Sequence, residues 1–294
     1  MHLHQLRSPE WRARVAARFG KKLLGFTRGE VCKSPVLIVG LQRSGTTMLM
    51  NIFCLHPDTE VFDECSDSKA FRNFRIRSLE VFREAIDGSH FRFPCFKVIA
   101  DSHQLPAFLD ACPHQKVVWM YREPAPNAAS RLKKFRRGTA AIRAVCEGRG
   151  GGGWFAEGVS EIVGRRLRSL DHSRLSDFDF AGLVWWARNQ LFFELGLAKD
   201  SRVRLLRYEN LVTEPGRTVK ELYRWIGMDG CEPSMRFVHS RSLRKPGLPA
   251  LDPQVAALCT GLLARLDRTH AAQWRTTNPG SDVVGLRFDG AAAV

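Results

Sequence analysis

A short apolar run followed by a glycine-bounded loop constrains this chain most. Pro35-Val-Leu-Ile-Val39 shows no polar alternation, which is typical of a parallel strand buried on both faces. The next residues, Gly40-Leu-Gln-Arg-Ser-Gly-Thr-Thr47, have the spacing GxxxxG followed by two hydroxyl residues. Residues 48–55 are apolar enough for a buried helix that ends before Pro57. Strand, loop and helix in this order predict a phosphate-binding loop, in which backbone N–H groups and a helix N-terminus face an anion.

The loop differs from that of a P-loop kinase or NTPase. A Walker loop has a lysine at position 46, to reach the β- and γ-phosphates, and here that residue is Thr46. Arg43 offers a cation at another place in the loop. No clear Walker B acid ends a predicted strand. A kinase or NTPase is therefore an alternative hypothesis with two features against it.

Three further apolar stretches predict strands, and each precedes a predicted helix. The strands and helices are expected over 95–100 and 104–112, over 116–121 and 125–137, and over 202–207 and 214–226, where Gly227 ends the last helix. Strands that alternate with helices predict an α/β fold of three layers, with a central, mostly parallel sheet and helices on both faces. We expect one domain over residues 34–280, a basic segment over 1–33 and a tail over 281–294.

Residues 138–176 form a long, weakly patterned region. Loops of this length are usually lids or binding elements, so the region is a candidate lid or acceptor loop. Trp154 and Phe155, beside the glycines at 148–153, either cap a ligand or anchor a surface excursion.

A surplus of positive charge points to an anionic partner. The 45 Lys and Arg residues against 30 Asp and Glu residues give a net charge of +15. Segment 1–33 has apolar residues every four positions among basic ones, which predicts an amphipathic helix. Three roles are open for that helix: it packs its apolar stripe on the domain, it attaches the protein to a membrane surface, or it is an organellar transit peptide. The chain has no apolar stretch of transmembrane length and no secretory signal, so we expect a cytoplasmic protein, peripheral at a membrane if the helix binds one.

A second anion site is predicted in Tyr121-Arg-Glu-Pro-Ala-Pro-Asn-Ala-Ala-Ser130, where a strand ends and a helix begins. Arg122 can fork onto a phosphate and Ser130 can donate a hydroxyl hydrogen bond. The spacing favours equally an arginine that caps a neighbouring carbonyl and a serine solvated on the helix. The basic run over 131–137 that follows is interpreted as a solvated helix face, with recruitment of phosphates or an acidic glycan as the alternative.

Together these motifs resemble those of the sulfotransferases that use 3′-phosphoadenosine 5′-phosphosulfate (PAPS). The resemblance covers about residues 34–245 and rests on the two sites above and on Arg207-Tyr-Glu-Asn-Leu-Val-Thr-Glu-Pro215 before a helix. It implies a P-loop-like nucleotide-binding fold and a PAPS donor that needs no metal. The cysteine spacings also predict no zinc site.

The resemblance assigns donor-binding residues. In that family the first loop holds the 5′-phosphosulfate and an Arg/Ser pair holds the 3′-phosphate. The matching residues here are Arg43, Ser44, Gly45, Thr46, Thr47, Arg122 and Ser130. Tyr208 would lie near the adenine. Lys245 matches, loosely, a basic C-terminal segment that supports the 3′-phosphate.

The resemblance also implies catalytic residues. Lys97 and Arg43 are candidate cations for the departing phosphate. Lys97 is similar in placement to the family lysine that contacts the bridging oxygen. The structural alternative is that the Lys97 side chain snorkels from the strand to water and has no catalytic role. Glu64 falls at the position of the base in tyrosylprotein-type and several bacterial members. The histidine of the cytosolic type would be residue 99, which is Ile99. His103 and Asp101 stay open as the base.

Acidic neighbours of Glu64 and the aromatic residues of the chain have simpler interpretations. Glu60 and Asp63 are expected on a solvated face. A basic nucleic-acid- or polyanion-binding protein is a further alternative, but no known nucleic-acid module is present. The aromatic pairs at 185–186 and 192–193 are expected in the core. We therefore expect no nucleic-acid partner. A carbohydrate or glycolipid hydroxyl is the first expectation for the acceptor, and a peptide tyrosine or small metabolite stays open.

Overall fold

The strand predicted over 35–39 lies at the centre of a five-stranded sheet. In the computed structural model, which describes residues 20, 32–64, 69–135, 139–149, 153–228, 230–239 and 247–275, every pair of neighbouring strands in this sheet is parallel. The strands are β1 (Val36–Gly40), β2 (Thr59–Asp63), β5 (Phe93–Lys97), β6 (Lys116–Tyr121) and β7 (Val203–Arg207), in the order β2-β5-β1-β6-β7. Their carboxyl ends therefore meet at one edge, where ligands of open α/β sheets bind.

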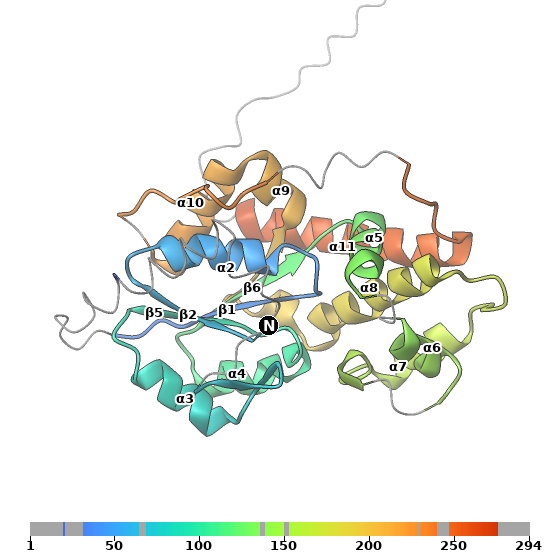
Figure 1. Cartoon of the computed structure of the whole chain (residues 1–294), viewed down its shortest axis with the longest axis horizontal. Coiled ribbons are helices and arrows are strands. Elements are labelled where there is room, and N and C mark those ends of the chain that lie inside the picture. The colour runs from blue at the N-terminus through green and yellow to red at the C-terminus, as the bar shows by residue number, and fades with distance from the viewer. Residues whose placement is uncertain are drawn as a thin grey trace, which may run out of the picture.

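Helices cover both faces of the sheet, as predicted (Figure 1). They are α2 (Thr46–Leu55), α3 (Leu79–Asp87), α4 (Leu105–Ala111), α5 (Pro124–Lys134), α6 (Ala140–Cys146), α7 (Glu161–Arg168), α8 (Asp177–Glu194), α9 (Tyr208–Thr213), α10 (Pro215–Ile226) and α11 (Pro253–Arg275). Helix α10 begins at a proline, whose missing N–H costs nothing at a helix start, and ends at Gly227, whose φ of 88° closes the last turn. The three-layer α/β prediction is confirmed.

The side chains of β1 show how one strand supplies two cores. Val36 and Ile38 pack with α2 and α10 on one face of the sheet, and Leu37 and Val39 pack with α3, α4 and α8 on the other. All four side chains are fully buried. This two-sided burial explains why the strand is a continuous apolar run rather than an alternating one.

The structure differs from the sequence-based elements in several places. Strand β5 begins at Phe93 and ends at Lys97, so 98–100 form the turn after the strand. Strand β2, helix α11 and the hairpin of β3 (Phe71–Arg72) and β4 (Arg75–Ile76) were not predicted. The region over 138–176 contains α6, α7 and the 3₁₀ turn Gly153–Phe155 rather than an open loop.

Some predictions fall outside the described residues. They are the amphipathic helix over 1–33, apart from Gly20 and the last two positions, and the tail over 281–294. Of the aromatic pairs expected in the core, Trp185, Trp186 and Phe192 are buried and Phe193 is partly buried. Among the described helices, none combines the length and apolar character needed to cross a bilayer.

Candidate active site

The loop between β1 and α2 depends on residues in the left-handed backbone region. Gly40 has φ 126°, and a Cβ there would lie 2.1 Å from the carbonyl oxygen of Met120 in β6, so only glycine fits. Arg43 adopts φ 71° and Gly45 adopts φ 92°. These turns bring the loop in front of the first N–H groups of α2, which have no partner within the helix. Strand, loop and helix therefore follow one another as the spacing predicts, and anion binding by the loop stays a prediction.

Asn127 of α5 holds this loop in place. Its Nδ2 donates to the carbonyl oxygen of Gln42 and to Oγ of Ser44, both at 3.1 Å. Asn127 and Ser44 are fully buried, whereas Arg43 and Thr47 are exposed. Ser44 thus has a structural partner, and Arg43 in the loop and Thr47 in α2 are accessible to solvent. Thr46 is buried at the start of α2.

The structure brings the two predicted anion sites together. Arg43 Nε donates to Oγ of Ser130 at 2.9 Å, and Arg122 Nη1 donates to the carbonyl oxygen of Arg43 at 3.3 Å. The guanidinium carbon of Arg122 lies 4.4 Å from the ring centroid of Tyr208, which is the first residue of α9. Burial lowers the pKa of Arg122 below its ordinary value, as expected of a cation held out of water. Four predicted donor-binding residues therefore form one cluster at the sheet edge.

A second cluster forms where β2 and β5 end side by side. Asp63 and Lys97 are opposite each other in the register of these strands. Lys97 Nζ lies 3.0 Å from Oδ1 of Asp63 and 3.7 Å from Oε1 of Glu64, and it donates to Oγ1 of Thr47 at 3.4 Å. Lys97 is 2% exposed, so its ammonium group does not snorkel to water. The lysine links the carboxylates to Thr47 in the first turn of α2.

The position of Asp63 corrects the expectation of a solvated face. Its side chain is 14% exposed and forms an ion pair with Lys97. Asp63 ends β2 and Lys97 ends β5, and the parallel register places them opposite each other, which the local sequence alone does not reveal. Glu60 lies on the same strand and is half-buried.

Glu64 is a buried carboxyl that is a weaker acid than an ordinary glutamate. Its Oε2 accepts a hydrogen bond from the backbone N–H of Ile99 at 2.9 Å. Burial raises its pKa to about 7, an effect that the attraction of Lys97 only partly offsets. A carboxyl with a pKa raised toward neutrality holds a proton more firmly than an ordinary glutamate, which is a property of groups that take up protons near neutral pH.

The alternative bases have other partners. Asp101 accepts from Arg75 Nη1 at 2.7 Å and from the backbone N–H of Ile76 at 2.8 Å, so it fixes the β3–β4 hairpin. His103 Nε2 lies 3.5 Å from Oε2 of Glu157, and burial lowers the pKa of its imidazole. Among the described residues, the hydrogen bonds and ion pairs of Lys97 given above involve neither Asp101 nor His103.

Residues 153–158 are held against α5 and α8 by contacts with Arg131 and Arg188. Arg188 of α8 donates to the carbonyl oxygens of Trp154 at 3.2 Å and Glu157 at 2.8 Å. The rings of Trp154 and Phe155 stack with centroids 4.0 Å apart. The guanidinium of Arg131 lies 4.8 Å from the ring of Phe155. The two aromatic residues thus anchor this segment, and their role toward a ligand stays a prediction.

Arg131 corrects part of the expected solvated face over 131–137. It is 2% exposed, and burial lowers its pKa to about 10. Its Nη1 donates to Oε1 of Gln42 at 3.1 Å, and its Nη2 has no hydrogen-bond partner among the described residues. Lys133 and Lys134 are exposed as expected.

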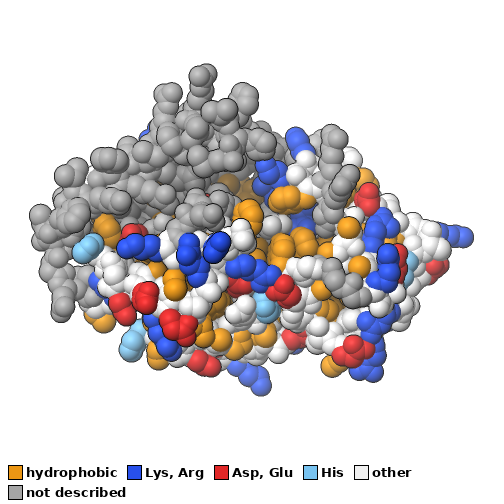
Figure 2. All heavy atoms as spheres, turned by 60° about the horizontal axis from the view of Figure 1, so that its bottom comes forward, with side chains coloured by type: hydrophobic (Ala, Val, Ile, Leu, Met, Phe, Trp, Pro, Cys, Tyr) orange, Lys and Arg blue, Asp and Glu red, His pale blue; other side chains and the backbone are white. Residues whose placement is uncertain are grey.

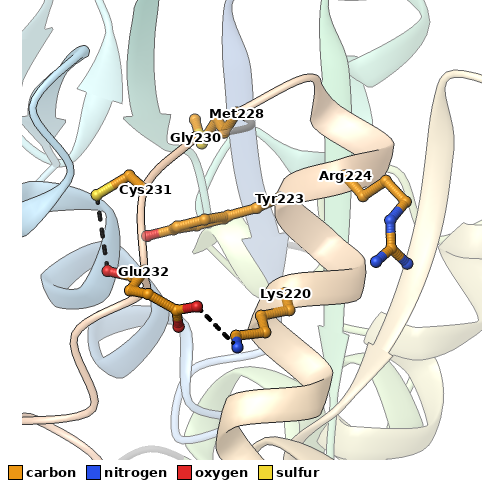
Figure 3. A pocket seen from close by; sticks show the side chains of 7 residues that line it. All are labelled: Lys220, Tyr223, Arg224, Met228, Gly230, Cys231 and Glu232. Atoms are coloured by element: carbon orange, nitrogen blue, oxygen red, sulfur yellow. Dashed lines mark hydrogen bonds and ion pairs between the residues drawn. The ribbon is translucent and has the colours of Figure 1, made fainter.

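Other surface features lie outside this site. Figure 3 shows a pocket at the end of α10 that contains none of the predicted site residues; its lining is Lys220, Tyr223, Arg224, Met228, Gly230, Cys231 and Glu232. On the face shown in Figure 2, Lys and Arg side chains are interspersed with Asp and Glu side chains.

Within the described ranges no group of three or more His, Cys, Asp or Glu side chains could hold a metal ion. Lys245 lies outside the described residues.

Comparisons with known proteins identify relatives of this chain. The family model described as "Sulfotransferase domain" matches residues 33–245. No curated protein matches. Among solved structures, a sulfotransferase from Alicyclobacillus acidocaldarius is 17% identical, with 83% of this chain and 100% of that chain covered and a TM-score of 0.51, which shows a shared fold. A sulfotransferase domain from the curacin biosynthetic pathway is 13% identical, with coverages of 80% and 99% and a TM-score of 0.43. A mouse sulfotransferase complexed with PAP is 13% identical, with coverages of 89% and 90% and a TM-score of 0.43.

Proposed function

Because this chain belongs to the sulfotransferase domain family, we propose that it transfers a sulfuryl group from PAPS to an acceptor hydroxyl, with Glu64 as the general base. One observation carries the proposal. A carboxyl with a pKa near neutrality lies 3.7 Å from a buried lysine, and that lysine contacts the anion-binding loop through Thr47. A proton acceptor, a cation and an anion cradle in contact are what sulfuryl transfer needs.

The described residues fit an anionic nucleotide donor. Arg43 and Thr47 are exposed at the loop, and Arg122 lies against the face of Tyr208 with Ser130 nearby. The Nη2 of Arg131 is a buried donor without a partner among the described residues, as expected in a site built for added negative charge. We assign the 5′-phosphosulfate to the loop, the 3′-phosphate to Arg122 and Ser130, and the adenine to the vicinity of Tyr208. Lys245 stays a proposed support of the 3′-phosphate.

The chemistry assigned to the chain is proton removal and charge stabilisation. PAPS supplies the sulfuryl group and leaves as PAP. Glu64, ionised, takes the proton of the acceptor hydroxyl as its oxygen bonds to sulfur. Lys97, Arg43 and the N-terminus of α2 stabilise the negative charge that grows on the departing phosphate oxygen. No step requires a metal ion.

We propose the acceptor class from the identity of the base. A carbohydrate or glycolipid hydroxyl comes first, because the proposed base is the carboxyl of Glu64. The position of the cytosolic-type histidine is occupied by Ile99. A peptide tyrosine or a small metabolite is the alternative. Transfer of labelled sulfate from PAPS into fractionated cell extract, followed by glycosidase or protease digestion of the labelled fraction, separates these classes.

A thermal-shift experiment tests the donor. The full chain is heated with PAP, with ATP plus Mg²⁺, and with a random oligonucleotide. A ligand that binds only the native state raises the melting temperature, so PAP alone, without metal, should stabilise the protein. The Arg122→Ala variant should lose most of the PAP-dependent shift, and the matched variant Arg217→Ala, which removes an exposed arginine from α10, should keep it. Stabilisation by ATP plus Mg²⁺ or by the oligonucleotide instead of PAP would favour the kinase or nucleic-acid alternative.

A further inference from the structure

Lys97 contacts two carboxylates unequally. Its Nζ lies within hydrogen-bond distance of Asp63, at 3.0 Å, and farther from Glu64, at 3.7 Å. The Asp63 side chain is 14% exposed and that of Glu64 is 5% exposed, so water solvates the Asp63 charge better. Of these two carboxylates, Asp63 is therefore the nearer ionic partner of Lys97, and the charge of Glu64 is supported less.

A base that paired alone with a buried lysine would have two faults. An opposite charge within about 4–6 Å stabilises the ionised carboxylate and lowers its pKa, which makes it a poor acceptor for a hydroxyl proton. After Glu64 took the proton, Lys97 would also be a buried cation without an anionic partner, which is unfavourable at 2% exposure. A second carboxylate beside the lysine removes both faults.

We propose that Asp63 is a positioning residue: it carries the ion pair with Lys97 throughout the reaction, so that Glu64 gains and loses a proton while the lysine stays beside Thr47. With Asp63 and Glu64 ionised, the three charged groups sum to one negative charge. When the acceptor proton moves to Glu64, they sum to zero and the Asp63–Lys97 pair is intact. The inference rests on the proposed function only for the role of Glu64 as base.

The surroundings of Glu64 support this division of roles. Among the described residues, the groups that face it are Lys97 from β5, Asp63 from β2 and the backbone N–H groups of Ile99 and Ala100 after β5. The lysine and the two N–H groups lower the pKa of Glu64, and burial and the negative charge of Asp63 raise it. Loss of the Asp63 charge would remove one raising effect and free Lys97 to pair with Glu64.

The Asp63→Asn variant tests the proposal, because it keeps the size of the side chain and removes its charge. The pKa of Glu64 is measured by carbon NMR of protein labelled at the glutamate carboxyl carbons, and Glu64→Gln assigns the signal. We expect the pKa to fall by about one unit or more in Asp63→Asn. Glu60→Gln, which removes a carboxylate from the same strand, should leave it unchanged. An unchanged or raised pKa in folded Asp63→Asn would overturn the proposal.

A double-mutant cycle asks whether Asp63 acts through the lysine. In the Lys97→Met background only the direct repulsion between the carboxylates remains, so Asp63→Asn should shift the pKa of Glu64 less than in the wild type. Equal shifts in the two backgrounds would reject a positioning role. Asp63→Glu restores the charge and should return the pKa toward the wild-type value, which keeps the test valid if Asp63→Asn folds poorly.

Kinetics give a second readout. In Asp63→Asn the acidic limb of the kcat/KM profile should move to lower pH and kcat should fall, because Glu64 becomes a weaker base. An acidic limb that stays at the wild-type pH would contradict the proposal. The NMR titration needs neither donor nor acceptor. A lowered pKa in a protein that transfers no sulfate would therefore reject the proposed function and leave the charge arrangement standing.

Discussion

Gly45→Ala should damage both stability and donor binding. Gly45 has φ 92°, and a Cβ there would lie 2.5 Å from Cδ2 of Tyr208 and 3.1 Å from Cε of Met120. The methionine end is flexible, but Tyr208 is 4% exposed and its ring has little room to move. The left-handed backbone costs a residue with a Cβ about 1–2 kcal/mol. Overpacking against the ring adds about 1–3 kcal/mol, so the free energy of unfolding should fall by about 2–5 kcal/mol.

The same substitution acts on the proposed donor site. The ring of Tyr208 lies under the guanidinium of Arg122, 4.4 Å from its carbon, so a displaced ring displaces the arginine. A misplaced guanidinium loses bidentate geometry toward a phosphate. We expect PAP to bind at least about tenfold more weakly, which corresponds to about 1.4 kcal/mol.

Urea denaturation followed by tryptophan fluorescence measures the stability, and titration calorimetry measures PAP binding. Gly216→Ala is the matched control, because no atom lies within 4 Å of a Cβ at this position on α10. It should be as stable as the wild type, or more stable by up to about 1 kcal/mol, since alanine favours helices over glycine. A Gly45→Ala protein with wild-type PAP affinity and a stability within about 0.5 kcal/mol of the wild type would refute the reasoning.

Four further predictions follow from the carboxyl groups of Glu64 and Asp101. Glu64→Gln should abolish sulfate transfer, measured with labelled PAPS, while calorimetry still detects PAP binding. Because an ionised Glu64 must accept the proton and its pKa is about 7, kcat/KM of the wild type should fall about tenfold per pH unit below that value. Burial raises the pKa of Glu64 above its ordinary 4.5, so the folded protein holds this proton more tightly than the unfolded chain does. Urea titrations should therefore show the wild type losing stability relative to Glu64→Gln as pH rises from about 4.5 to 7. Asp101→Asn should cost about 1–3 kcal/mol in the same assay, since it weakens the bonds to Arg75 and Ile76, whereas a catalytic base at this position would lose turnover at unchanged stability.

The central sheet could be predicted because its inner strands are buried on both faces. β1 and β6 are continuous apolar runs, and glycine spacing marks the loop that follows β1. Strand β2 was missed because it is an edge strand whose Thr-Glu-Val-Phe-Asp sequence mixes polar and apolar residues, and the hairpin strands have two residues each. Short strands and strands of mixed polarity lack the hydrophobic signal that burial imposes, whereas β7, the other edge strand, was predicted from its buried Val203, Leu205 and Leu206.

Sequence motifs named candidate site residues, but they could not predict the contacts that form between segments far apart in the chain. The loop glycines, Arg122 and Lys97 could be named from their motifs. Asp63 could not, because only the register of β2 on β5 places it opposite Lys97. Asn127 is an ordinary helical residue until α5 lies beside the loop, and Arg131 differs from its basic neighbours only in facing inward.

The order of the strands has a consequence for how the chain folds during synthesis. β1 ends at Gly40, but its two neighbours, β5 and β6, are complete only at Lys97 and Tyr121. At about 5–20 residues per second, a ribosome needs on the order of ten seconds to make the intervening chain. During that time a fully apolar strand has two unpaired edges, the condition that favours association between nascent chains. The residues that make β1 a good centre for the sheet therefore make its early exposure hazardous, and a nascent chain stopped between β5 and β6 should bind a holdase chaperone more strongly than one released after Tyr121.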